Sequence, residues 1–102
     1  MKKITIHTPE THTNIILDTI NQSGAGVIRN YDYCSFITKG IGTFRPLKGS
    51  SPAVGESDKI NFVPEDKIEL VCPDELLETV ISDIKKVHPY EEMAYDVTEI
   101  GK

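Results

Sequence analysis

The sequence has 102 residues, a formal net charge of −5, and 38% hydrophobic and 26% charged residues. A chain of this length buries one core, and this composition is typical of a folded globular domain, so we expect a single domain over residues 1–102. The negative charge and the lack of basic clusters disfavour a nucleic-acid partner. Neither a signal peptide nor a membrane-spanning apolar run is recognisable, so we expect a cytoplasmic protein without membrane contact.

Two stretches, residues 4–20 and 68–84, share one pattern and form an internal repeat. Each begins with alternating apolar residues, which predicts a strand because neighbouring side chains of a strand point to opposite faces. A proline follows, Pro9 in the first stretch and Pro73 in the second, and proline suits the first position of a helix. Beyond it the apolar residues recur with helical spacing. Each stretch therefore predicts a strand followed by a helix.

The other two strands are expected at about residues 33–44 and 93–100. The glycines of SGAG end the first helix, and Pro89 blocks continuation of the second. The resulting order, β-α-β-β-α-β, predicts an α+β ferredoxin-like fold, in which two helices cover one face of a four-stranded antiparallel sheet.

This topology makes the two middle strands neighbours, which would bring Cys34 close to Cys72. The reducing compartment argues against a disulfide, and we expect two free, buried thiols. Ile37 and Val71 are expected on the uncovered face of the sheet, where apolar side chains indicate contact with another subunit.

A long loop is expected over residues 45–66, between the second and third strands. The segment RPLKGSSPAVGESDKINFVPED contains three Pro, two Gly and three Ser, and has few apolar residues for another core layer. Structureless connections of this length are uncommon in compact domains and are usually functional or mobile. If a site lies on a loop, we expect it here.

The glycines near the start of this loop give the first candidate site. Gly40, Gly42 and Gly49 accompany two basic residues, Arg45 and Lys48, which could bind an anion. The pattern matches no phosphate-binding motif, since it contains neither GxGxxG nor GKS/GKT and no helix is expected to begin after these glycines. A kinked strand end is the alternative interpretation, because glycine within a strand often marks a bulge or a close backbone approach.

The stretch HPYEE near the end of the chain gives the second candidate site. His88 and Glu91 could ligate a divalent metal ion, since imidazole and carboxylate groups are common metal ligands. Glu91 and Glu92 would point to opposite faces of an entering strand, so only one of them could join His88. The alternative is structural: His88 stands at the negative end of the second helix, Pro89 ends that helix, and Tyr90 packs against the domain.

The segments GAG, CSFITKGIGTFRPLKG, GE and HPYEEMAYDV together resemble the inserted PII-like domain of the Nif-three-like (YqfO-type) dinuclear metal proteins, over residues 4–100. In that family the segment interrupts a larger metal-binding core, whereas here it is expected to stand alone. The HPYE turn also resembles that of CutA-type divalent-cation tolerance proteins. The resemblance implies a PII/CutA-like fold, a homotrimer assembled through its sheets, and no dinuclear site, because the ligands of that site lie outside the inserted domain.

On this resemblance, the leading hypothesis is a non-enzymatic module that binds a small anionic effector, a divalent metal ion or a partner protein. One alternative is an interaction protein that docks onto a separate protein carrying the hydrolytic metal core. Another is a small enzyme that uses His88 and Glu91 as an acid–base pair. The expected ligand contacts are Arg45, Lys48, Gly49, Glu56 and Tyr90, and the expected metal ligands are His88 and Glu91.

Overall fold

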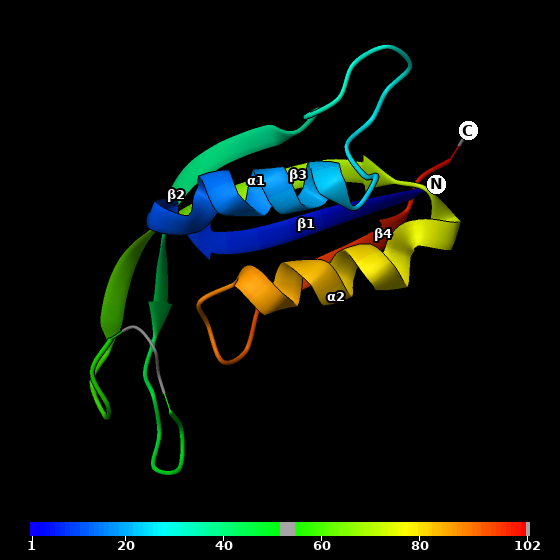
Figure 1. The fold of residues 1–102 in the computed structure, drawn as a ribbon. Coiled ribbons are helices and arrows are strands. Elements are labelled where there is room, and N and C mark those ends of the chain that lie inside the picture. Colours follow the sequence, from blue (N-terminus) through cyan, green and yellow to red (C-terminus); the bar gives the residue numbers. More distant parts are fainter. Residues whose placement is uncertain (52–54, 102) are drawn as a thin grey trace.

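The computed structural model describes residues 1–51 and 55–101. A four-stranded sheet carries two α-helices on one of its faces, and a short 3-10 turn precedes each helix (Figure 1). The elements in chain order are β1 (Lys2–Pro9), η1 (Glu10–His12), α1 (Thr13–Gln22), β2 (Phe36–Phe44), β3 (Asn61–Cys72), η2 (Asp74–Leu76), α2 (Leu77–Val87) and β4 (Tyr95–Glu99).

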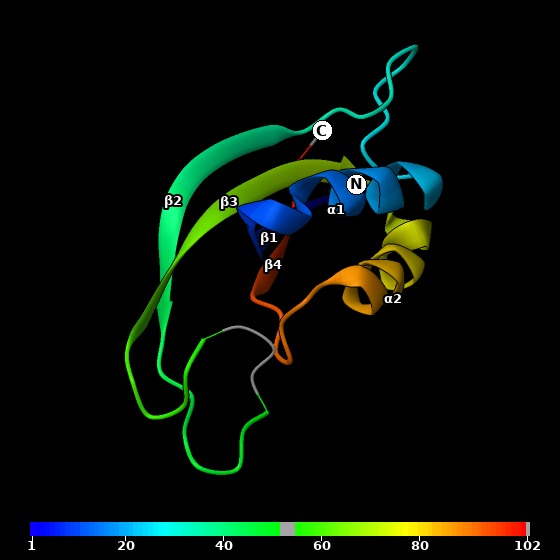
Figure 2. The same ribbon diagram turned by 60° about the vertical axis from the view of Figure 1, so that its left-hand side comes forward.

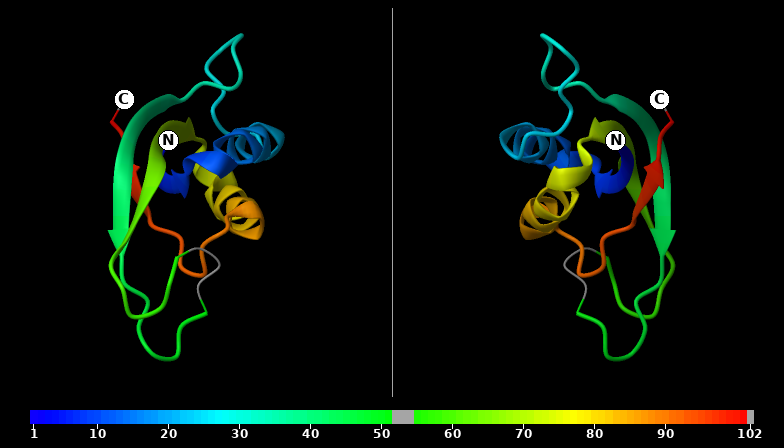
Figure 3. Two further views of the ribbon diagram at one scale, coloured as in Figure 1. Left: turned by 90° about the vertical axis from the view of Figure 1, so that its left-hand side faces the viewer. Right: turned by 90° about the vertical axis from the view of Figure 1, so that its right-hand side faces the viewer.

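The strands lie in the order β2-β3-β1-β4, and every neighbouring pair is antiparallel. This is the β-α-β-β-α-β arrangement expected from the sequence, so the ferredoxin-like α+β fold is confirmed. The two views of Figure 3 show both helices on one side of the sheet, with the other side uncovered. The two ends of the chain lie side by side, since the N–H of Ile100 donates to the carbonyl oxygen of Met1 at 3.3 Å.

The core lies between the sheet and the helices and follows from the repeated sequence pattern. Alternate residues of β1 and β3 point to the helices, and Ile4 pairs with Leu70 as Ile6 pairs with Ile68, so the two strands present one apolar surface. Burial of each large aliphatic side chain contributes about 1.5–3 kcal/mol. The buried apolar residues are Ile4, Ile6, Ile16, Ile20, Ala25, Ile68, Leu70, Cys72, Val80 and Ile84.

The strand β2 begins at Phe36, three residues later than expected, because the preceding chain turns away from the sheet. Arg29 and Tyr33 have φ angles of 53° and 54°, in the left-handed region that strands do not adopt. Ile28 and Tyr31 exchange backbone hydrogen bonds and close a small hairpin. Figure 1 shows this loop projecting from the end of the sheet at which the two chain termini lie.

Cys34 and Cys72 are not opposite each other in the pairing of β2 with β3. Cys34 lies before β2 and is partly exposed, whereas Cys72 is the last residue of β3 and is fully buried. Both thiols are free, but only Cys72 has the burial expected for the pair.

The strand β3 begins at Asn61, so the last part of the loop expected over residues 45–66 is extended and pairs with β2. Pro64 is tolerated there because β1 ends with Pro9 opposite Glu65, and beyond this point β3 has a neighbour on one side only. Residues 40–44 of β2 pair with residues 61–65 of β3 and form a two-stranded arm, which reaches beyond the helices (Figure 2).

The strand register corrects one expectation about the uncovered face. Val71 pairs with Lys3 and lies on that face as expected, but Ile37 pairs with the buried Ile68 and therefore points to the helix side. Directly opposed residues of an antiparallel pair point to the same face. The apolar side chain of Phe36, which pairs with Glu69 and is 69% exposed, lies on the uncovered face instead.

One carboxylate is buried at the edge of the core. Asp66 of β3 accepts a hydrogen bond from the Thr13 hydroxyl at 2.6 Å, and its other oxygen lies 3.0 Å from the ammonium of Lys39. Burial raises the pKa of Asp66, but the hydrogen bonds from Thr13 and Lys39 and the lysine charge outweigh it, so the net shift is downward. This cluster connects the start of α1 to β2 and β3.

We predict that Asp66→Asn lowers the free energy of unfolding by about 1–3 kcal/mol near neutral pH, because the buried side chain loses the charge that strengthens its hydrogen bonds with Thr13 and Lys39. A lowered folded-state pKa means that Asp66 stabilises the protein above its unfolded pKa of about 4 and that this contribution is lost as the pH falls through the folded pKa. Urea unfolding from neutral to acidic pH should therefore show a weaker pH dependence in Asp66→Asn than in wild type. The exposed Asp32→Asn serves as control, and equal curves for all three proteins would contradict the prediction.

Candidate functional site

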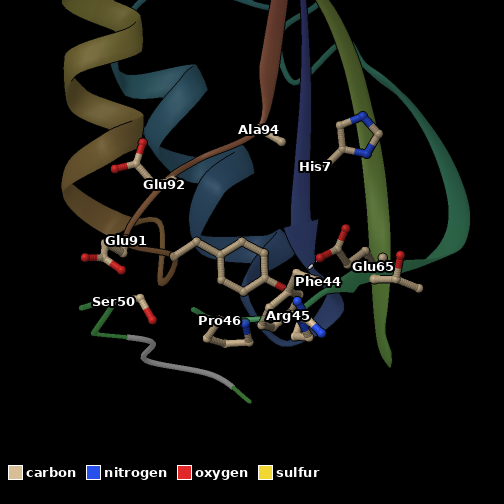
Figure 4. A pocket seen from close by; sticks show the side chains of 12 residues that line it. His7, Phe44, Arg45, Pro46, Ser50, Glu65, Glu91, Glu92 and Ala94 are labelled. Carbon is tan, nitrogen blue, oxygen red and sulfur yellow. Dashed lines mark hydrogen bonds between the residues drawn. The ribbon is translucent and has the colours of Figure 1, made fainter. Parts of the chain in front are cut away.

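A pocket of about 310 Å³ lies at the end of the sheet where β4 begins (Figure 4). Four parts of the chain enclose it: the end of β2 with the turn after it, the neighbouring part of β1, the neighbouring part of β3, and the segment that connects α2 to β4. Its lining residues are His7, Gly42, Thr43, Phe44, Arg45, Pro46, Ser50, Glu65, Tyr90, Glu91, Glu92 and Ala94.

The pocket exists because β4 is short. It pairs with β1 only from Lys2 to Ile6, and the chain that enters it crosses the end of the sheet instead of extending the ladder. We call residues 88–94, which connect α2 to β4, the crossing segment. One backbone hydrogen bond, from the N–H of His7 to the carbonyl oxygen of Ala94 at 3.1 Å, holds the crossing segment against β1. The side chains of the HPYEE stretch are thereby carried to the end of the sheet.

Tyr90 is the central contact of the pocket. Its hydroxyl donates to Oε2 of Glu65 at 2.6 Å, and its ring meets the ring of Phe44 edge-on at 5.7 Å between centroids. Burial, followed by the hydrogen bond to Glu65 and the charge of that carboxylate, raises the pKa of Tyr90. The phenol therefore stays protonated at neutral pH and acts as a fixed donor to Glu65.

Gly42 makes room for the Glu65 carboxylate. A Cβ atom at position 42 would lie 2.3 Å from the carboxyl carbon of Glu65, whereas a Cβ at Gly40 would meet nothing within 4 Å. The position that the Glu65 carboxylate occupies is thus open only because residue 42 has no side chain.

His88 connects the crossing segment to β1 by hydrogen bonds. Its Nε2 lies 2.7 Å from the carbonyl oxygen of His7, and the N–H of Tyr90 donates to its Nδ1 at 3.1 Å, so both ring nitrogens have partners. Burial lowers the pKa of His88, and the hydrogen bond to His7 opposes this only in part. The neutral tautomer that donates from Nε2 satisfies both contacts, and His88 does not line the pocket.

Charged side chains surround the rings of Phe44 and Tyr90. In the view of Figure 4, Arg45 and Glu65 lie on one side of the pocket, with Glu91 and Glu92 on the other. Glu91 accepts a hydrogen bond from the N–H of Ser51 at 3.1 Å. Within residues 1–51 and 55–101, none of these four charged groups has an ion-pair partner within 4 Å.

Three of the residues expected to contact a ligand lie outside the pocket lining. Lys48 and Gly49 are exposed on the turn beyond Pro46, and Gly49, with a φ of 96°, has open space around its Cα. Glu56 pairs with Lys59 at 2.9 Å, and its N–H donates to the side chain of Asn61. Arg45 and Tyr90 are the two expected ligand contacts that the structure brings together.

The expected metal ligands are also separated by their contacts. Both nitrogens of His88 are engaged within the protein, while Glu91 faces the pocket and the backbone of Ser51. The part of the chain that the structure describes contains no group of three or more His, Cys, Asp or Glu side chains suited to hold a metal ion.

Glu65 is the main pocket residue that the sequence did not single out. It was placed within the expected loop, where no face or neighbour could be assigned to it. The signal that could have located it is the pair of glycines in ITKGIG, because a glycine within a strand indicates that another group approaches closely.

The fold is that of the CutA proteins. The chain superimposes on CutA1 from Pyrococcus horikoshii with a TM-score of 0.71 and 15% identity, covering 100% of this chain and 85% of that one. For the PII-like protein CutA from Nostoc sp. PCC 7120 the TM-score is 0.70 and the identity 15%, with 98% and 81% covered. Identities this low establish the fold alone.

Closer similarity connects the chain to larger bacterial proteins. It is 41% identical over 95 residues to the GTP cyclohydrolase 1 type 2 homolog of Halalkalibacterium halodurans and 37% identical over 97 residues to that of Bacillus subtilis, covering 93% and 95% of this chain but 26% of each relative. The structure of a Bacillus cereus protein related to NIF3 matches with a TM-score of 0.82 and 35% identity, over 99% of this chain and 25% of that one. No protein-family model matches.

The chain is therefore a homologue of one segment of the Nif-three-like proteins, which confirms the resemblance seen in the sequence. It spans about a quarter of the length of the curated relatives it matches. None of the helices in the described residues is long and apolar enough to cross a bilayer.

Gly42→Ala should displace the Glu65 carboxylate and break its hydrogen bond to Tyr90, at a cost of about 1 kcal/mol in stability. Gly40→Ala is the matched control, since the same added methyl group meets open space on the same strand. NMR spectra should show the Tyr90 ring signals shifted in Gly42→Ala, toward those of a Glu65→Ala variant, and unchanged in Gly40→Ala. Identical Tyr90 signals in both glycine variants would refute the proposed role of Gly42.

Proposed function

We propose that this Nif-three-like module is a non-enzymatic ligand-binding protein whose pocket at the end of the sheet takes a small anionic molecule. The observation that carries the proposal is the placement of Arg45 on the rim of a pocket walled by Phe44 and Tyr90, with no ion-pair partner in the described residues. A guanidinium group is suited to bind carboxylate or phosphate through paired N–H donors. Lys48 and Gly49 would contact only a ligand that extends out of the pocket along the turn.

The geometry favours binding over catalysis. His88, the residue expected to act as acid or base, uses both ring nitrogens to hold the crossing segment and is absent from the pocket lining. We propose that His88 positions Tyr90 and neither ligates a metal ion nor transfers a proton. The two free cysteines are compatible with the cytoplasmic location expected from the sequence.

The proposal is tested by titrating the protein with inorganic phosphate, benzoate and nucleoside monophosphates, followed by calorimetry and by thermal unfolding. We expect at least one anion to bind and raise the unfolding temperature. Arg45→Ala should weaken that binding at least tenfold, because it removes a charge-assisted contact. Lys86→Ala removes a charge from the exposed face of α2, outside the pocket, and should leave the affinity unchanged. Absence of any response from the wild type, or equal losses in both variants, would refute the proposed site.

We also propose that the module forms a homotrimer through its sheet edges. The sheet has two free edges, β2 and β4, and most residues of these strands are exposed. Ile41 and Phe62, on the two strands of the arm, are 71% and 70% exposed, and uncovered apolar surface of this kind favours association.

Sedimentation equilibrium should give three times the 11.4 kDa mass of the chain. Ile41→Asp should shift the population to monomer, because it places a charge in the apolar surface that we expect to be buried on association. Leu47→Asp, on the turn that follows β2, is the control. A wild-type monomer at all concentrations would exclude the trimer.

One further observation favours docking onto a larger protein as a second function. The relatives carry about four times as much chain, and the loop that presents Val27, Ile28 and Tyr31 projects beside the two termini (Figure 1). These side chains are 44–73% exposed. An exposed apolar group at this end is placed to contact the remaining three quarters of a Nif-three-like protein.

A further inference from the structure

We propose that the ligand of the pocket also carries N–H donors, as an ammonium, amidinium or guanidinium group, and that Glu65 binds them. This inference rests on the proposed function, in which Arg45 binds the anionic end of the same molecule. It assigns a recognition role to Glu65 and narrows the ligand from a simple anion to a small molecule with groups of both signs.

The first argument is the unused capacity of the Glu65 carboxylate. A carboxylate accepts about four hydrogen bonds, and Glu65 receives one, at Oε2 from Tyr90. In residues 1–51 and 55–101, Oε1 accepts no hydrogen bond from a side chain, and no side-chain nitrogen of a Lys, Arg or His lies within 4 Å of the carboxylate oxygens. A partly buried carboxylate with an unused oxygen facing a pocket is suited to accept donors from a bound molecule.

The second argument is that the position of Glu65 is fixed. Gly42 leaves the space that the carboxylate occupies, and Tyr90 holds one of its oxygens. The tyrosine is in turn held by His88 through its N–H and by ring contact with Phe44. A preorganised acceptor loses little conformational entropy when a ligand binds, which is the arrangement that recognition requires.

The third argument is the charge balance of the pocket. The lining contains one guanidinium group, Arg45, and three carboxylates, Glu65, Glu91 and Glu92. A ligand with negative groups alone gains the contact with Arg45 but is repelled by the three carboxylates, so it should bind more weakly than a ligand that also carries a cationic group. A ligand that presents a cationic donor to Glu65 and an anion to Arg45 meets opposite charges at both ends. The rings of Phe44 and Tyr90 add a surface on which a planar or cationic group can pack.

Two probe sets test this inference with the full chain by titration calorimetry. The compact set is L-phenylalanine with its single-headed analogues phenethylamine and 3-phenylpropionate. The extended set is 4-amidinobenzoate with benzamidine and benzoate. In at least one set, the two-headed probe should bind at least tenfold more tightly than either analogue, since two charge-assisted contacts form in place of one.

Glu65→Gln is the decisive variant, because the amide keeps the shape of the side chain and an oxygen that accepts from Tyr90 while removing the charge. It should abolish the advantage of the two-headed probe and leave binding of the single-headed anion unchanged or improved. Glu78→Gln, which removes a carboxylate from the exposed face of α2, is the charge-matched control and should behave as wild type.

The outcomes separate the two proposals. If the single-headed anions bind through Arg45 but no two-headed probe exceeds them, or if Glu65→Gln matches Glu78→Gln, the role of Glu65 is refuted and anion binding stands. If no probe binds the wild type, both proposals fail. A chemical-shift map of the wild type with the tightest probe must show Phe44 and Tyr90 among the largest changes, and changes confined to another surface would overturn the assignment.

Discussion

The pairing of β1 with β3 is the interaction on which the rest of the structure depends. The two strands run antiparallel from Lys2 opposite Cys72 to Pro9 opposite Glu65, and their alternate side chains form the floor on which both helices pack. The end of this ladder also determines where the pocket lies. Glu65, opposite Pro9, is the first residue of β3 that pairs with β1, and the crossing segment meets β1 close by, at His7.

The sequence predicted the parts of the fold whose hydrophobic pattern is imposed by burial. Ile4 and Ile68 alternate with polar neighbours because one face of each strand is covered, and the helices show the spacing of one covered stripe. The start of β3 was not predicted because α1 and α2 do not cover the arm. Its side chains, such as Phe62, are exposed, so no alternation identifies the strand, and Pro64 argued against one.

The sequence identified a site residue only where the residue type itself indicated binding, without knowledge of its neighbours in the fold. Arg45 and Tyr90 stood out as a cation and an aromatic in conspicuous motifs, and both line the pocket. Glu65 did not stand out, because its surroundings depend on a strand register and on a tyrosine 25 residues away. His88 was noticed for its chemistry, yet the structure uses it to hold the backbone of His7 and Tyr90 in place.

The adjacency of the two chain ends has a consequence for how such a unit can be used in evolution. Because Met1 and Ile100 are hydrogen-bonded neighbours at one end of the sheet, the fold can be entered and left at nearly the same point in space. A unit with this property can interrupt a surface loop of a host protein without separating the residues on either side of the insertion. The same architecture therefore suits a guest within a longer polypeptide as readily as a molecule of its own.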